Sequence, residues 1–169
     1  KRIGLLLGGG VVGMIAAYIF YPNARNRLNI WLRGEGDTFQ IDRAHDTIVN
    51  GGLMGMGPSA GVQKFKLPEA HTDYIFSVIG EEFGLIICMG IVILFMLIIA
   101  RVLIRLLQEE DQFTVLAVAG LIAQFGGQAM INMAVNTQLA PSKGMTLPFI
   151  SYGGSSLLAL CLGMGLLLA

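Results

Sequence analysis

An uncharged apolar run at residues 83–100 limits most strongly what this chain can fold into. A helix needs about 20 apolar residues to cross the roughly 30 Å hydrocarbon core of a bilayer, and this run approaches that length. The whole chain is 54% hydrophobic and only 13% charged, with a mean hydropathy of +0.70. These values are typical of membrane proteins, so lipid is the solvent for much of the chain.

Four apolar segments predict an all-α polytopic membrane protein. We expect transmembrane segments at residues 3–21, 73–100, 113–135 and 149–169, the second starting as a helix outside the bilayer, with loops at residues 22–72, 101–112 and 136–148. The first loop is polar, rich in Pro and Gly, and too long for a simple hairpin, and loops of this length usually carry function. Because the chain begins with Lys and stops inside an apolar run, we expect it to be part of a longer protein.

The placement of charge and cysteine argues against several classes of function. The formal net charge is zero and no basic block stands apart, which gives no case for nucleic-acid binding. Cys88 and Cys161 both fall in apolar runs, where a thiol behaves as a small hydrophobe. No metal-ligand spacing is present. The glycine-rich residues 51–57 lack the Gly-Lys-Ser/Thr of a phosphate loop, so they predict tight turns or close helix packing.

The third segment carries a polar stripe. Gln124, Gln128, Asn132 and Asn136 follow one another at four-residue spacing. Since a helix turns about 100° per residue, successive members rotate by only about 40° and form one slowly wrapping stripe. Amides are poorly tolerated facing lipid, so the stripe must face protein or a wet cavity. We favour hydrogen bonding between helices, and lining of a substrate cavity is the alternative.

Residues of both charges gather where the second segment begins. Lys66, Glu69, His71 and Asp73 lie close together in the chain, at the lip of a predicted span. A half-buried carboxylate in this position can act as a general base. The alternative for Asp73, or for Thr72 before it, is a plain helix N-cap. His71 alone is more typical of a surface or hydrogen-bonding residue.

Two further features flank the predicted spans. Glu81 and Glu82 are costly in hydrocarbon, so we expect them to pair with Lys or Arg from the long loop or from other helices. Before the fourth segment, Pro148 and Gly153 predict an irregular helix entry, which is tolerated only where it lines a cavity or is covered by protein. Lys143 offers a cation near this opening, with snorkelling to the interface as the alternative.

Two pairs of motifs resemble a known family. They are Leu67-Pro-Glu-Ala-His-Thr-Asp73 with Ile79-Gly-Glu-Glu-Phe-Gly84, and Pro141-Ser-Lys-Gly with Leu147-Pro-Phe-Ile-Ser-Tyr-Gly-Gly-Ser-Ser156. They are similar to the signatures of SEDS proteins, which act in shape, elongation, division and sporulation. The resemblance covers essentially the whole chain. It implies a bundle of about ten transmembrane helices, of which this chain is the C-terminal part, four helices of one transmembrane domain with a large extracytoplasmic loop.

The resemblance implies a peptidoglycan glycosyltransferase that polymerises lipid II, with inversion, on the outer face of the bacterial cytoplasmic membrane. The acid of the family's His-Thr-Asp motif is its essential catalytic residue, which assigns the general base to Asp73. Cations would stabilise the departing lipid diphosphate. The substrate-binding candidates are Lys66, Lys143, Lys64, Arg43, Glu69, His71 and Ser151. No cofactor is specified, although a divalent cation such as Mg²⁺ or Mn²⁺ would suit the diphosphate.

The resemblance also implies partners: a class B penicillin-binding transpeptidase and other division proteins at the septum. Ala70 and the Pro-Ser-Lys-Gly segment are more similar to the cell-division branch, the FtsW type, than to the elongation branch, the RodA type, although Ser142 departs from the expected Thr. Two alternatives remain from other classes. A lipid II flippase would depend on Gln128 or Asn132, and a division scaffold would not need the loop acids. We expect residues 1–169 alone to be inactive.

Overall fold

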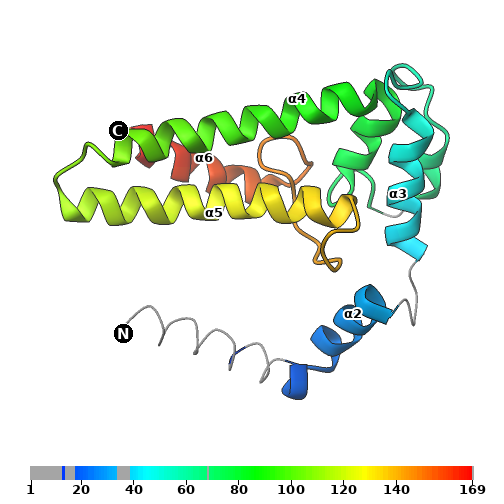
Figure 1. The fold of residues 1–169 in the computed structure, drawn as a ribbon, viewed down its shortest axis with the longest axis horizontal. Helices are drawn as coiled ribbons and strands as arrows, with labels where there is room; N and C mark the ends of the chain where they lie inside the picture. The colour runs from blue at the N-terminus through cyan, green and yellow to red at the C-terminus, as the bar shows by residue number, and fades with distance from the viewer. Residues whose placement is uncertain (1–12, 14–17, 34–38, 68, 169) are drawn as a thin grey trace. The chain divides into compact units, whose positions relative to one another are not determined.

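The structure, a computed structural model, describes residues 13, 18–33, 39–67 and 69–168. Every regular element in these residues is helical, which confirms the all-α prediction for them (Figure 1). The elements are α2 (Pro22–Arg33), α3 (Phe39–Gly51), the short 3-10 helix η1 (Gln63–Lys66), α4 (Ile75–Leu106), α5 (Gln112–Asn136) and α6 (Gly154–Leu168). Most of the first expected span, residues 3–21, falls outside the described residues.

The chain forms two compact units, residues 1–39 and residues 40–169. In the first unit, α2 begins at Pro22, whose fixed φ suits the first position of a helix. The Arg25 guanidinium lies over the Tyr18 ring at 5.6 Å from its centroid, and the Tyr18 hydroxyl donates to Asn29 Oδ1 at 3.3 Å. The segment predicted as a long loop, residues 22–72, therefore contains α2, α3 and η1.

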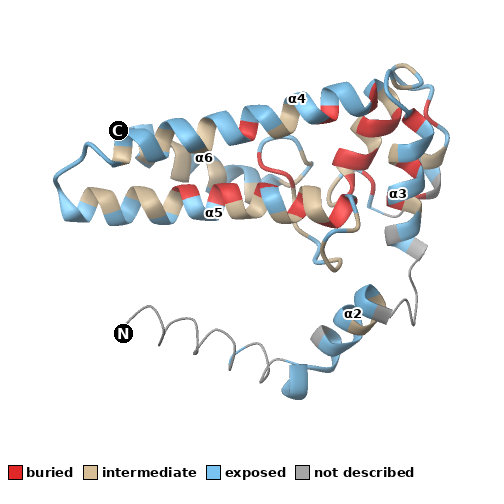
Figure 2. Ribbon diagram, viewed as in Figure 1, coloured by how far each residue is buried: buried red, intermediate tan, exposed pale blue. Residues whose placement is uncertain are grey.

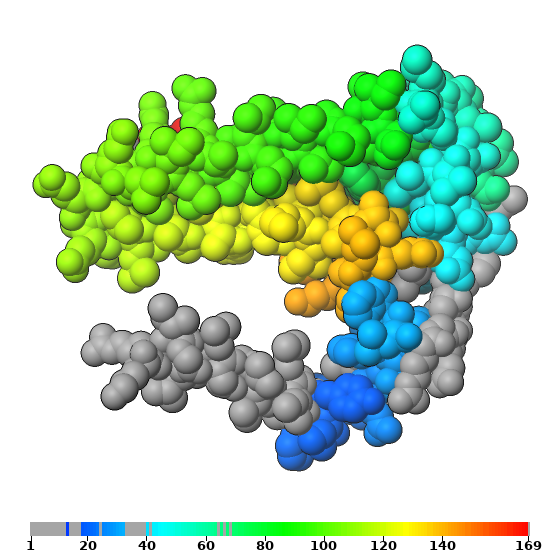
Figure 3. All heavy atoms as spheres, in the orientation of Figure 1, coloured from blue at the N-terminus to red at the C-terminus, as the bar shows by residue number. Residues whose placement is uncertain are grey.

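In the second unit, α4 and α5 lie side by side along their length, and α6 packs against α5 (Figure 1). Within the residues that the structure describes, α4 and α5 are the two helices long and apolar enough to cross a membrane by length and composition. Only 17% of the most apolar window of α4 and 22% of that of α5 are buried. A core helix of a soluble protein would be mostly buried, so the broad exposed surface of this pair suits lipid or further helices (Figure 3).

The apolar helix α6 is shorter than predicted. It begins at Gly154 and not at residue 149, because Pro148 and the residues after it form turns and Phe149 has a φ of +62°. The irregular helix entry was predicted, but the span of residues 149–169 that included it was too long at this end. The peptide N–H of Leu147 donates to Ser151 Oγ at 2.7 Å, which closes the turn.

The predicted continuous helix at residues 73–100 is wrong in two respects. The helix α4 runs from Ile75 to Leu106, so residues 101–106 of the predicted loop at residues 101–112 are helical, and α4 is broken at Gly84. Gly84 has φ 82° and ψ 175°, a region that only glycine adopts readily. The break frees backbone groups of α4, and the glycine-rich loop at residues 52–62 satisfies them. The N–H of Met56 donates to Glu81 O at 2.9 Å, and the N–H of Leu85 donates to Gly52 O at 2.9 Å.

The buried residues gather toward the end of the second unit that carries the loops (Figure 2). We call this end, with α3, the 52–62 loop, the 69–74 loop and the 141–153 loop, the loop-bearing end. Two apolar clusters join loops to helices: Phe76, Cys88, Phe95, Ile122, Phe125, Ala129 and Leu147 form one, and Ala44, Leu67, Ala70, Tyr74 and Val135 form the other. Leu147 is 1% exposed, so the 141–153 loop is packed into the bundle.

Candidate active site at the loop-bearing end

Asp73 lies in the 69–74 loop, just before α4, and is half-buried. Its backbone carbonyl accepts hydrogen bonds from Asn132 Nδ2 at 2.8 Å and from Asn136 Nδ2 at 3.1 Å. The N-cap of α4 is Tyr74, with no side-chain capping bond, and the Thr72 hydroxyl donates to Glu69 O at 3.1 Å. Tyr74, and neither Asp73 nor Thr72, is therefore the N-cap of α4.

The 141–153 loop lies directly against the Asp73 carboxylate. A Cβ placed on Gly144 would come within 3.1 Å of Asp73 Oδ2, and Gly144 itself has a φ of +58°. Lys143, the residue before it, is exposed. A second contact joins the same two loops, because the N–H of Tyr152 donates to His71 O at 2.9 Å. The motif segment at residues 67–73 thus adjoins the segment at residues 141–156, although about 70 positions separate the two in the chain.

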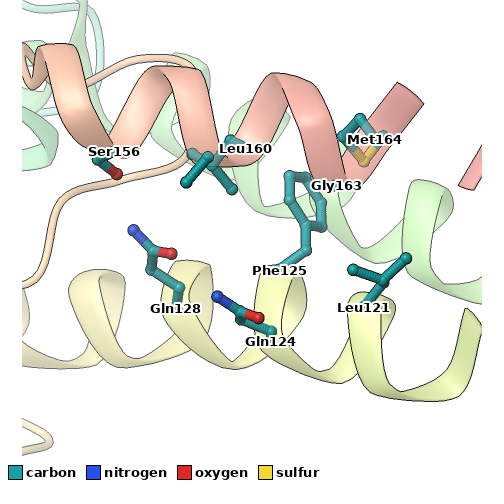
Figure 4. A pocket seen from close by; sticks show the side chains of 9 residues that line it. Leu121, Gln124, Phe125, Gln128, Ser156, Leu160, Gly163 and Met164 are labelled. Carbon is teal, nitrogen blue, oxygen red and sulfur yellow. The ribbon is translucent and has the colours of Figure 1, made fainter. Parts of the chain in front are cut away.

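The amide stripe of α5 holds these loops in place. Gln128 Nε2 donates to both the carbonyl and the hydroxyl of Thr146, each at 3.0 Å, and Asn132 Nδ2 donates to Met145 O. Gln124 is exposed and lines a cavity of about 150 Å³ between α5 and α6, together with Gln128 and Ser156 (Figure 4). Three members of the stripe therefore bind loop backbone or loop side chains, and the fourth faces the cavity.

Glu81 is fully buried at the same end, a placement that sequence reasoning did not foresee. Its Oε1 accepts hydrogen bonds from Asn50 Nδ2 at 3.0 Å, from the N–H of Val62 at 3.0 Å and from the N–H of Gln63 at 2.9 Å. A side chain at Gly61 would overlap this carboxylate. The available signal was the presence of glycines in two segments, residues 51–57 and 80–84, which the structure shows in close approach.

The remaining predicted residues lie on several elements. Lys64 and Lys66 belong to η1, and their side chains lie outside the described part of the chain. Arg43 is half-buried on α3, whereas Glu69, with a φ of +55°, and His71 are exposed in the 69–74 loop. Ser151 uses its hydroxyl to hold Leu147. The loops thus bring Asp73, His71, Lys143 and Ser151 to one end, and their assigned roles stay predictions.

The site offers the chemistry of the Asp73 carboxylate, whose backbone carbonyl is hydrogen-bonded to Asn132 and Asn136. Asp73 is fixed through its carbonyl, and a carboxylate is a group that can take a proton from a hydroxyl. Among the described residues, no three His, Cys, Asp or Glu side chains gather as a metal site. The expectation of a divalent cation stays a prediction.

Comparison with known proteins identifies the family that the chain resembles in sequence. The sequence model described as cell cycle protein, covering FtsW, RodA and SpoVE, matches residues 2–169. The chain is 45% identical to the probable peptidoglycan glycosyltransferase FtsW of Caulobacter vibrioides, over 96% of this chain and 42% of that protein. It is 36% identical to the protein of the same description from Methylomonas methanica, over 98% of this chain and 44% of that protein.

A solved structure matches as well. It belongs to work on the structural coordination of polymerization and crosslinking by a peptidoglycan synthase complex, and the match has a TM-score of 0.73 at 30% identity. The match covers 98% of this chain and 47% of that chain. This chain therefore spans less than half the length of the relatives it matches.

Proposed function

We propose that this chain, which belongs to the cell cycle protein family of FtsW, RodA and SpoVE, carries the catalytic base of a septal peptidoglycan glycosyltransferase. The observation that carries the proposal is the Asp73 carboxylate, set against Gly144 by two loops that meet at the end of the bundle. The whole protein would have about ten spanning helices, and this chain would be the C-terminal part of that single transmembrane domain.

Asp73 acts as the general base in this mechanism. The 4-hydroxyl of an acceptor sugar loses its proton to the Asp73 carboxylate as its oxygen attacks the anomeric carbon of a lipid-linked donor. The bond from that carbon to the lipid diphosphate breaks, and the configuration inverts. A half-buried carboxylate anchored by its own backbone carbonyl suits this role, because its position does not depend on binding the substrate.

Cations complete the chemistry by stabilising charge on the departing diphosphate. Lys143 is the first candidate, because it is exposed and adjoins Gly144 at the Asp73 carboxylate. Lys66 is next by its motif position, followed by Lys64 and Arg43. His71, Glu69 and Ser151 would contact the sugar or peptide parts of the substrate, and a divalent cation would add to the neutralisation of the diphosphate.

The setting of this activity is a further part of the proposal. The family is membrane-integral, and the loop-bearing end would face the outside of the bacterial cytoplasmic membrane at the division septum. The matched structure concerns a peptidoglycan synthase complex that couples polymerization to crosslinking, which supports a penicillin-binding transpeptidase as partner. Relatives described as FtsW favour the division role over elongation.

The geometry favours polymerisation over transport of lipid II. Gln128 and Asn132, on which a transport route would depend, donate their amide hydrogens to residues of the 141–153 loop and to Asp73. A side chain that is hydrogen-bonded to a packed loop is poorly suited to line a path that must open.

The test is lipid II polymerisation by the full-length protein in complex with its transpeptidase. Asp73→Asn keeps the shape of the side chain and removes its basicity, so we expect glycan formation to fall by about 100-fold or more. Elution as an intact complex controls for folding. Lys143→Ala should reduce the rate less, because other cations remain. Glycan formation at the wild-type rate by Asp73→Asn would move the base elsewhere and reopen the flippase and scaffold alternatives.

A further inference from the structure

We propose that Asn132 is a positioning residue for polymerisation: its side-chain amide fixes the backbone of Asp73 against the 141–153 loop. The inference rests on the proposed function, because it assigns Asn132 a role in aligning the base with the loop that carries Lys143. It adds a residue of α5 to a site whose candidates otherwise lie in loops, on η1 and on α3.

The first step is the contact itself. Asn132 is 1% exposed, and its Nδ2 donates to the carbonyl of Asp73 at 2.8 Å and to the carbonyl of Met145. An amide NH₂ has two hydrogens, so both are used, one for each loop. Met145 follows Gly144, whose backbone lies against the Asp73 carboxylate. The buried Asn132 amide thereby links Asp73 to Met145, the residue next to Gly144, which contacts the Asp73 carboxylate.

The second step is the orientation of the amide, which its neighbour determines. Asn136 is fully buried, and its Oδ1 accepts from the Ser77 hydroxyl at 2.7 Å and from the Ser77 N–H at 3.2 Å. Its Nδ2 therefore points toward Asp73 O and toward Asn132, where it lies 2.8 Å from Asn132 O and 3.4 Å from Asn132 Oδ1. Reversing Asn132 would set its Oδ1 against two carbonyl oxygens, so only the orientation with two donated bonds is favourable.

The third step separates positioning from ordinary helix packing. An amide that only joined helices would bond to another helix, but both backbone acceptors of Asn132 lie in loops. The same face of α5 supplies two matched comparisons. Gln128 donates to Thr146 alone and so holds one loop, and Gln124 is exposed and makes no hydrogen bond within the described part of the chain. Only Asn132 donates across both loops among these three amides.

The experiment measures turnover and KM for lipid II with the full-length protein and its transpeptidase. Asn132→Leu, nearly equal in size, removes both donors, and we expect turnover to fall about 100-fold, as misplacement of about 1 Å produces, while KM changes less than about threefold. Gln128→Leu should lower turnover less than about tenfold, and Gln124→Leu should leave it unchanged. Near wild-type turnover by Asn132→Leu would overturn the inference.

A double variant distinguishes positioning from simple destabilisation. If Asn132 aligns Asp73 with the loop of Lys143, its loss should matter less once Lys143 is gone, so Asn132→Leu should lower the turnover of Lys143→Ala by less than about tenfold. If the fold-losses of turnover in Asn132→Leu and Lys143→Ala simply multiply in the double variant, Asn132 is only structural. Should Asn132→Leu not assemble with its partner, Asn132→Ser keeps one donor and decides the question: a turnover loss of about tenfold at unchanged KM supports positioning, and wild-type turnover overturns it.

Asp73→Asn in the same assay separates the two levels of the proposal. If Asp73→Asn makes glycan at the wild-type rate, the proposed function fails, and the inference falls with it. If Asp73→Asn is inactive and Asn132→Leu is not impaired, only the inference fails.

Discussion

Two buried polar side chains hold the loop-bearing end together in opposite ways. Asn132 on α5 donates to the carbonyl oxygens of two loops, whereas Glu81 on α4 accepts from the N–H groups of Val62 and Gln63 and from a side-chain amide. An amide NH₂ can supply two hydrogens, and a carboxylate can receive several. Each buried side chain therefore matches the kind of backbone group that its loop presents.

The two sites also differ in what they hold. Asn132 joins the 69–74 and 141–153 loops, where the proposed base lies, whereas Glu81 fixes the 52–62 loop and the start of η1. The same loop bonds to α4 on both sides of its break at Gly84. We therefore expect changes at Asn132 to act mainly on turnover and changes at Glu81 to act mainly on stability, and four substitutions test this contrast.

The largest loss of stability should follow Glu81→Leu. This change leaves three part-buried donors, the side-chain amide of Asn50 and the N–H groups of Val62 and Gln63, without the acceptor that the buried Glu81 carboxylate provides, at a cost of about 4 kcal/mol. Thermal unfolding of the full-length protein measures it. Glu82→Leu is the comparison, because Glu82 is only half-buried and its carbonyl, which accepts from the Gly57 N–H, is kept by any substitution. Equal losses from both changes would contradict a special role for the Glu81 carboxylate.

Gly84→Ala should cause the next largest loss, about 3 kcal/mol of unfolding free energy. Alanine is strained at φ 82°, ψ 175°, and its Cβ would overlap the backbone of Leu53 and Gly55 in the docked loop. At Gly90, on the same helix, an added Cβ would have no other atom of the described chain within 4 Å. Gly90→Ala should therefore leave stability unchanged or slightly raise it. Unfolding of the two variants, with proteolysis of the 52–62 loop as a second readout, tests the difference. A neutral Gly84→Ala would mean that the break is not required.

The break at Gly84 also shows what the sequence could not predict. Residues 83–100 read as one uninterrupted apolar segment, and nothing local marks a left-handed residue at its start. The break depends on hydrogen bonds from residues 52–57, which lie about 30 positions away in the chain, and such a pairing has no periodicity. The glycines on both sides were visible in the sequence, but not the fact that they meet.

For the amide stripe, the sequence predicted which residues share a helix face but not which groups they bind. Four-residue spacing placed Gln124, Gln128, Asn132 and Asn136 on one face, because helix geometry alone determines that face. The acceptors were not predictable, since they are carbonyls of loops whose course depends on tertiary packing. The motifs therefore supplied Asp73 and Lys143 as candidates, and the structure added their neighbours and the buried groups behind them.

A smaller effect should follow Ser77→Ala. The Ser77 hydroxyl donates to Asn136 Oδ1 at 2.7 Å, and the Ser77 N–H, which remains, donates to the same atom at 3.2 Å. We expect a loss of about 1 kcal/mol in unfolding free energy, with turnover changed less than about threefold, since Asn132 keeps its bonds. Both are measured on the full-length protein. A loss of turnover as large as that of Asn132→Leu would shift the positioning role to the Asn136–Ser77 pair.

The smallest effect should lie at an exposed carboxylate that makes the same kind of contact as Glu81. Asp111 caps α5, accepting from the Thr114 hydroxyl at 2.6 Å and the Thr114 N–H at 2.9 Å, and these bonds hold the pKa of Asp111 below its ordinary value. Because the folded pKa is the lower one, the stabilisation is present above the unfolded pKa, near 4, and is lost as pH falls through the folded value. Asp111→Ala should therefore lower Tm slightly at pH 7 and not at strongly acidic pH, whereas Asp111→Asn, which still caps, should show little pH dependence of this kind. A Tm difference between wild type and Asp111→Ala that stays constant from neutral to strongly acidic pH would contradict this prediction. It would mean that the charge of this exposed carboxylate does not stabilise the fold, in contrast to the buried Glu81 carboxylate.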